Sequence, residues 1–242
     1  MRSVRDQLLM VEELRQAGAR ERALALCRDL VRQAPRNPDP LRAAARIALE
    51  AGRPQLALPM LERAAALAPH RAELHCDLAA LLRDLGEDAG AEETFAKAVA
   101  ADPACQAAQL ALAEICEAQG RVGDAIRHLD MLVGLNPAAL EPRTRLALLL
   151  AASGEEERAA EITRETMRHA ETALAESYRR NRSQGPGTPA DEKDVERLAW
   201  SYALLSGALA GADIARFEER RGEIGAALRS YRRVLGVLTG EA

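Results

Sequence analysis

Apolar residues in the first 170 positions of this chain recur at intervals of three and four, in one stretch after another. Residues 74–85 carry five leucines at this spacing, and the stretch that follows carries Ala91, Phe95, Ala98 and Val99. Such spacing gathers the apolar side chains on one face of a helix. We therefore expect successive helices that pack as hairpins. No stretch shows the strict alternation that is typical of a strand.

Glycine, alanine and proline divide these stretches with a fixed step of 34 residues. The glycines are Gly18, Gly52, Gly86, Gly120 and Gly154, the alanines five residues later are Ala23, Ala57, Ala91, Ala125 and Ala159, and the prolines are Pro35, Pro69, Pro103 and Pro137. Glycine adopts the left-handed conformation that ends a helix, and proline cannot continue one. The pattern predicts five tandem helical hairpins over residues 1–182. Glu171 stands where a fifth proline is due.

One proline breaks the local rule. Pro59 lies about five residues into a helix that we expect to open near Pro54. There it removes a backbone hydrogen bond at a cost of about 3 kcal/mol. We predict either a kink or a late start of this helix.

The pattern changes beyond residue 171. An apolar stripe continues to about residue 182, so the last helix of the array is expected to be extended. The Gly- and Pro-rich residues 183–190 are expected to form a flexible connector, and residues 191–242 a C-terminal helical hairpin. This hairpin holds most of the aromatic residues, which either cap the end of the array or form a second interaction surface for a client or a second copy. The residues of that surface are Trp200, Tyr202, Phe217, Tyr231 and Arg232.

The two-helix, 34-residue unit resembles the tetratricopeptide repeat. The third unit is most similar, with Leu78, Ala79, Leu82, Gly86, Ala91, Phe95, Ala98 and Pro103 at the positions of the family pattern. Leu or Ala replaces most of the large aromatic residues of that pattern, so the resemblance is one of period and of small residues. It covers residues 4 to about 171. It implies an all-α fold, a right-handed solenoid of stacked hairpins, in a bacterial protein.

The resemblance also implies a concave groove, which the family lines with residues ten, six and three positions before each glycine. These are Leu8, Glu12, Arg15, Arg42, Arg46, Leu49, Cys76, Ala80, Arg83, Leu110, Glu114, Glu117, Thr144, Leu148 and Ala151. Both charge signs and several apolar side chains are present, which suits a peptide. Arg42 and Arg46 either grip a carboxylate as a fork or are simply exposed to solvent. None of the slots holds the lysines and asparagines with which some family members clamp a C-terminal carboxylate.

Composition and charge limit the classes of partner and the location that we expect for this protein. A net charge of −4 argues against general nucleic-acid binding. The longest uncharged run has 15 residues, fewer than a membrane-spanning helix needs, and the charged N-terminus does not resemble a signal peptide. We therefore expect a soluble, cytoplasmic protein without membrane insertion. Its four cysteines, Cys27, Cys76, Cys105 and Cys116, are expected to be reduced thiols.

No catalytic motif is present, and we expect no enzyme, cofactor or metal site. The cluster of His70, His75 and Cys76 suggests a metal at first, but His75 falls on the buried side of its helix. The sequence favours a scaffold or adaptor that binds a protein or peptide in the groove. The alternative is an assembly or secretion chaperone whose client docks on the C-terminal aromatic hairpin.

Overall fold

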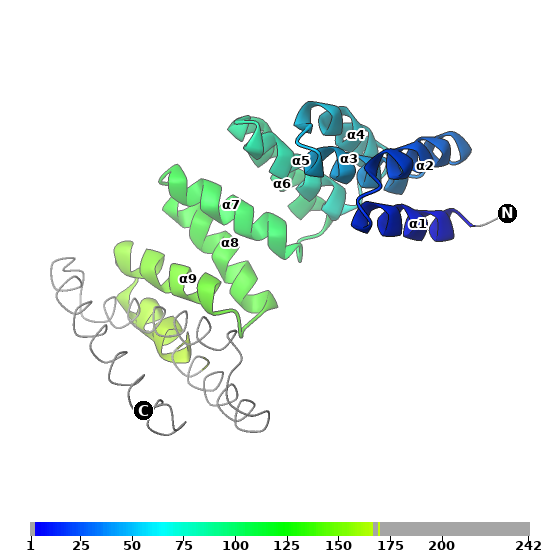
Figure 1. The fold of residues 1–242 in the computed structure, drawn as a ribbon. Coiled ribbons are helices and arrows are strands. Elements are labelled where there is room, and N and C mark those ends of the chain that lie inside the picture. The colour runs from blue at the N-terminus through cyan, green and yellow to red at the C-terminus, as the bar shows by residue number, and fades with distance from the viewer. Residues whose placement is uncertain (1–2, 167–168, 170–242) are drawn as a thin grey trace, which may run out of the picture. The chain divides into compact units, whose positions relative to one another are not determined.

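The computed structural model describes residues 3–166 and 169, and these residues are helical with no strand among them (Figure 1). The helices are α1 (Val4–Gln16), α2 (Arg20–Gln33), α3 (Asp39–Glu50), α4 (Pro54–Leu67), α5 (Ala72–Asp84), α6 (Asp88–Ala101), α7 (Gln106–Ala118), α8 (Val122–Leu135) and α9 (Leu140–Ala152). Residues 156–166 are also helical. The expected all-α fold is confirmed. The chain divides after Ala118 into two compact units, which we describe in turn.

In the first unit each helix packs against the next along the chain, from α1 to α7. The expected left-handed glycines are confirmed, because all five have φ between +68° and +84°. Gly86 illustrates the turn: it follows α5 by two residues, and the amide of Glu87 donates to the carbonyl of Leu82 at 2.9 Å. This bond satisfies a carbonyl at the helix end and identifies a Schellman motif.

The contrast between Gly86 and Gly90 yields a stability prediction. A Cβ added at Gly86 meets nothing within 4 Å, so Gly86→Ala costs only the strain of φ +81°, about 1–2 kcal/mol. Gly90 lies inside α6, and a Cβ there makes an ordinary contact of 3.7 Å with Leu82. We expect Gly90→Ala to stabilise the protein by up to about 1 kcal/mol. Urea denaturation, monitored by circular dichroism, measures the free energy of unfolding of both variants. If the two substitutions change it in the same direction, this explanation is contradicted.

The proline turns contain a contact that the sequence analysis did not find. Three first helices carry a buried polar residue six positions after the preceding proline, and its side chain bonds the carbonyl of that proline. The nitrogen–oxygen distances are 3.0 Å for His75 and Pro69, 2.9 Å for Gln109 and Pro103, and 2.6 Å for Arg143 and Pro137. His75 is therefore a structural residue, and no group of three metal-binding side chains occurs among residues 3–166.

The second helix of each hairpin contributes to the core a small residue and, one turn further on, a second buried side chain. The five alanines at the 34-residue step are at most 5% exposed. One helical turn further on lie Cys27, Leu61, Phe95, Leu129 and Thr163, all of them at most 3% exposed. The threonine fits this buried place because its hydroxyl donates to the carbonyl of Ala159 at 2.7 Å. The core pattern thus continues into residues 156–166.

In the second unit α8 packs against α9, and the side chains of residues 156–166 bond to both. Arg143 is only 5% exposed at its side chain, and its Nη1 donates to Glu165 Oε2 at 2.8 Å. The Nε of the same side chain reaches the Pro137 carbonyl. One buried guanidinium therefore joins α9 to the preceding turn and to the following helix.

The late start that we considered for the helix at Pro59 is wrong. Helix α4 begins at Pro54, and Pro59 lies inside it. Proline has no amide hydrogen to donate to the carbonyl of Gln55, four residues before it. Both residues are exposed, so water can satisfy that carbonyl. The extended end of the fifth hairpin, the connector 183–190 and the hairpin 191–242 lie outside the described residues and stay predictions.

Candidate protein-binding groove

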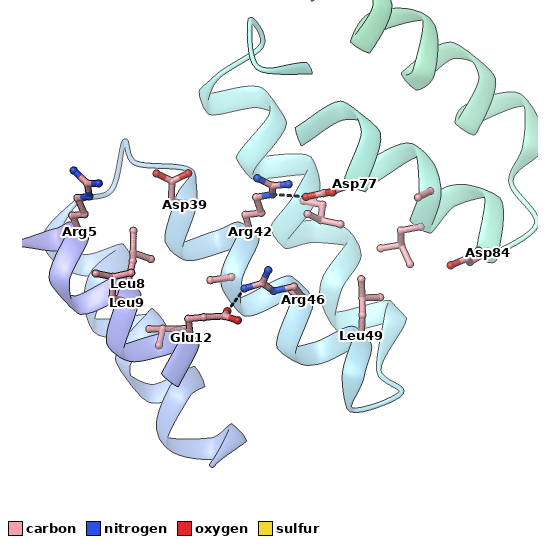
Figure 2. Close-up of a pocket in the computed structure, with 15 residues that line it drawn as sticks. Arg5, Leu8, Leu9, Glu12, Asp39, Arg42, Arg46, Leu49, Asp77 and Asp84 are labelled. Atoms are coloured by element: carbon pink, nitrogen blue, oxygen red, sulfur yellow. Dashed lines mark hydrogen bonds and ion pairs between the residues drawn. The ribbon is translucent and has the colours of Figure 1, made fainter. Parts of the chain in front are cut away.

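An open hollow of about 640 Å³ crosses α1, α3 and α5 in the first unit (Figure 2). These are the first helices of the first three hairpins, the elements that were expected to line a groove. The residues that line the hollow, together named the groove, are Arg5, Leu8, Leu9, Val11, Glu12, Asp39, Arg42, Ala43, Arg46, Leu49, Leu61, Asp77, Ala80, Leu81 and Asp84.

The structure gathers part of the sequence-predicted site in the groove. Leu8, Glu12, Arg42, Arg46, Leu49 and Ala80 line it, whereas Arg15, Cys76, Arg83, Leu110, Glu114 and Glu117 lie on α1, α5 and α7 without lining it. Thr144, Leu148 and Ala151 belong to α9 in the second unit. Thr144 is buried, and its hydroxyl donates to the Leu140 carbonyl at 2.9 Å. A contact of these other positions with a partner stays a prediction.

The groove also contains positions that the sequence analysis missed. Residues thirteen before the glycine line it in two hairpins, as Arg5 and Asp39, and residues nine before the glycine line it in three hairpins, as Leu9, Ala43 and Asp77. Asp84 lies at the far end of α5. The steps thirteen, ten, six and three continue the three-and-four spacing of one helix face. Extending the expected stripe by one turn therefore predicts Arg5 and Asp39, whereas Asp77 and Asp84 fall outside these steps.

Most charges in the groove pair with a neighbouring hairpin. Arg42 Nε lies 2.5 Å from Asp77 Oδ2, which joins α3 to α5, and Arg46 pairs with Glu12 on α1 (Figure 2). Asp39 accepts from Arg71 at 2.7 Å. Arg42 and Arg46 are thus neither simply exposed nor an open fork, because a partner carboxylate has to compete with Asp77 and Glu12 for them.

Two groove residues of opposite charge, Arg5 and Asp84, are not part of these ion pairs. The side chains of Arg5 and Asp84 make no hydrogen bond or ion pair within the described part of the chain. In Figure 2 Arg5 lies on α1 at one side of the close-up, and Asp84 lies on α5 at the other. Apolar lining residues such as Ala43 and Leu49 come from α3, between those two helices. The groove therefore offers a cation at one edge, apolar side chains beside paired charges in the middle, and an anion at the other edge.

The pairing of Glu12 with Arg15 and Arg46 leads to a prediction about pH. The hydrogen bond from Arg15 lowers the pKa of the Glu12 carboxyl from 4.5 to about 2; desolvation opposes this, and Gln16 and Arg46 add to it. Because the folded state holds the proton less well than the unfolded state, the stability from these pairs is present above pH 4.5 and is lost between about 4.5 and 2. We expect a ¹³C NMR midpoint near 2 for Glu12. In the Arg15→Leu variant the midpoint should rise towards 4.5, and an unchanged midpoint would contradict this assignment.

The second predicted surface, Trp200, Tyr202, Phe217, Tyr231 and Arg232, lies outside the described residues. Client docking or self-association there stays a prediction. Within the described part of the chain, no helix has the length and apolar character that crossing a membrane requires.

A family model described as tetratricopeptide repeat matches residues 48–115 and 89–137 of this sequence. Among solved structures, pilF of Pseudomonas aeruginosa has a TM-score of 0.61 and 16% identity, with 94% of this chain and 91% of that chain covered. MamA from Desulfovibrio magneticus RS-1 has a TM-score of 0.55 and 19% identity over 70% and 96% of the two chains. YrrB, a TPR protein with an unusual peptide-binding site, has a TM-score of 0.53 and 16% identity over 67% and 84%. At these identities the likeness is one of fold. No curated protein matches the sequence.

Proposed function

Because this chain belongs to the tetratricopeptide repeat family, we propose that it is a non-enzymatic scaffold or adaptor that holds a partner polypeptide in the groove of α1, α3 and α5. The observation that carries the proposal is the composition of the groove. An open hollow across three hairpins presents apolar side chains between Arg5 and Asp84, two opposite charges that the described chain leaves unpaired.

The geometry favours a polypeptide over a compact small molecule. The groove is open, and apart from Leu61 on α4 its lining comes from three successive first helices, so an occupant has to be long enough to reach from α1 to α5. Both a helix and an extended peptide present side chains at regular intervals along such a path. The structure that is similar in fold and is described as having a peptide-binding site, YrrB, is in keeping with this choice.

The pairing of the groove charges specifies the chemistry of the partner. Arg42 and Arg46 are already neutralised by Asp77 and Glu12, so a partner gains little by addressing them. Arg5 and Asp84 instead favour an acidic residue near α1 and a basic residue near α5. Charge complementarity of this kind sets the orientation and the choice of partner more than the raw affinity. We therefore propose an amphipathic segment with an acidic end, an apolar middle and a basic end.

Filling the groove tests this function. The probe is a set of synthetic peptides, selected against the full-length chain from a random twelve-residue display library and measured by fluorescence anisotropy. Ala80→Trp places an indole in the hollow and should weaken binding at least about tenfold, or about 1.4 kcal/mol. Ala96→Trp is the control, since Ala96 is exposed on α6 and does not line the groove.

The proposal is supported if the selected peptides lose affinity for the Ala80→Trp variant and keep it for the Ala96→Trp variant. Equal affinities for the two variants would place the peptides elsewhere and overturn the groove assignment. Circular dichroism of both variants shows whether each has kept the helical content of the unmodified chain.

A further inference from the structure

Two cysteines meet in the first unit where the third hairpin joins the fourth. Cys76 lies on α5, and Cys105 directly precedes α7. Their Sγ atoms are 3.3 Å apart, although the residues are 29 positions apart in the sequence. A disulfide bond measures about 2.05 Å between its sulfur atoms, so only a small further approach separates the two thiols from bonding distance.

The surroundings of the two sulfur atoms are ordered and partly accessible. Both cysteines are half-buried and pack against the apolar core of the first unit. The backbone at Cys105 is held on both sides, because its amide donates to Asp102 at 3.0 Å and its carbonyl accepts from Gln109 at 3.0 Å. The remaining cysteines differ: Cys27 is 0% and Cys116 is 2% exposed. One pair alone, among the four cysteines, therefore combines proximity with access.

We propose that Cys76 and Cys105 form a reversible intramolecular disulfide when the protein meets a low-molecular-weight disulfide such as oxidised glutathione. This inference is independent of the proposed binding function. In the first step the sulfur of one cysteine attacks the oxidant, an S–S bond of the oxidant breaks, and one thiolate leaves. In the second step the other cysteine attacks the mixed disulfide and releases a second thiolate. The two thiol protons end on the two released thiolates, so two protein thiols are oxidised and one small disulfide is reduced.

The environment of Cys76 indicates how the rate of ring closure depends on pH. Burial, with the neighbouring Cys105 adding to it, raises the pKa of the Cys76 thiol to about 12. Little of this thiol is ionised near neutral pH, and the thiolate is the nucleophile in exchange reactions. Closure should therefore accelerate as the pH rises.

The disulfide would restrain α5, the helix that lines one side of the groove. It would link α5 to the residue before α7 and enclose α6, so that a loop containing most of the third hairpin is closed covalently. Closing such a loop restricts the unfolded chain and stabilises the folded one. Asp77, next to Cys76, and Ala80, one turn further along α5, both line the groove. Oxidation would thereby stiffen this side of the groove.

The test uses the full-length chain with oxidised glutathione at pH 8, followed by acid quenching and intact-mass analysis. We expect a product lighter by two hydrogen atoms, a proteolytic fragment in which Cys76 is linked to Cys105, and a melting temperature several degrees above that of the reduced protein. Dithiothreitol should reverse all three changes. Cys105→Ser and, as a second variant, Cys105→Ala should prevent them, whereas Cys27→Ser should not.

Several results would overturn the proposal. These are a glutathione adduct that persists on either cysteine, a disulfide that links two chains, a bond to Cys27 or Cys116, and recovery of four free thiols after the treatment. A linked fragment without a rise in melting temperature would overturn the stabilising role. Repeating the reaction at pH 7 and pH 9 tests the thiolate route, because closure at the same rate at both pH values would contradict attack by an ionised cysteine.

Discussion

Phe95→Ala is expected to lower the free energy of unfolding by about 3–5 kcal/mol. Phe95 is 3% exposed on α6 and belongs to the core cluster that extends from α3 to α7. Its ring centroid lies 5.9 Å from the guanidinium carbon of Arg83 on α5. The cluster consists mainly of alanine and leucine, and a close-packed core of this kind relaxes only in part into the cavity that alanine would leave. The loss should be measured by urea denaturation of the full-length chain.

The repeat supplies a matched control for this substitution. The corresponding residues one step of 34 before and after Phe95 are Leu61 and Leu129, both buried. Phe95→Leu therefore places a side chain that this fold already uses, and it should cost less than about 1.5 kcal/mol. Equal losses for the alanine and leucine variants would contradict the packing role. A change in the slope of the denaturation curve would point instead to a loss of cooperativity between hairpins.

Reversing both unpaired groove charges is expected to have the largest effect on binding. Asp84→Arg combined with Arg5→Glu should weaken the selected peptides about hundredfold, or about 2.7 kcal/mol, if each reversal costs about tenfold. The reason is that these two side chains have no described partner within the chain and are left to pair with the peptide. Peptides in which the acidic and basic ends are exchanged should recover the affinity with the doubly reversed variant.

The control for charge alone is a reversal outside the groove. Glu62 is exposed on α4 and does not line the groove, so Glu62→Arg makes the same change in net charge as Asp84→Arg. Affinity should be unaffected by Glu62→Arg at physiological salt. If Glu62→Arg weakens binding as much as Asp84→Arg does, the effect comes from overall charge, and the proposed orientation of the peptide is wrong.

The helices and their turns could be predicted because their signals are local. Each glycine of the 34-residue step has the left-handed φ that it was expected to supply, and helices α2, α4, α6 and α8 end two residues before a proline of the step. The side-chain hydrogen bonds to the proline carbonyls could not be predicted in the same way. His75, Gln109 and Arg143 share a place in the repeat and bond the carbonyl through a side-chain nitrogen, but they are three different residue types, so no sequence pattern marks the position.

The sequence predicted which helices line the groove, but it did not predict how the charged residues of the groove pair. A helical stripe follows from spacing, which located Arg42 and Arg46, but ion pairing depends on how consecutive hairpins align. Glu12 and Arg46 occupy the same place in neighbouring hairpins, 34 residues apart, and the stacking brings them together. The contact between Cys76 and Cys105 likewise arises from the packing of the third hairpin, which no spacing of cysteines along the sequence reveals.

Photo-crosslinking tests most directly whether the partner lies in the groove. A benzoylphenylalanine replaces Leu49, which lines the groove and is 38% exposed, or Leu56, which is 51% exposed on α4 and does not line it. Each variant is irradiated with a peptide from the selected set, and the products are identified by mass spectrometry. The proposed function predicts a crosslink from position 49 that excess unlabelled peptide suppresses, and none from position 56. A specific crosslink from position 56, with none from position 49, would contradict it.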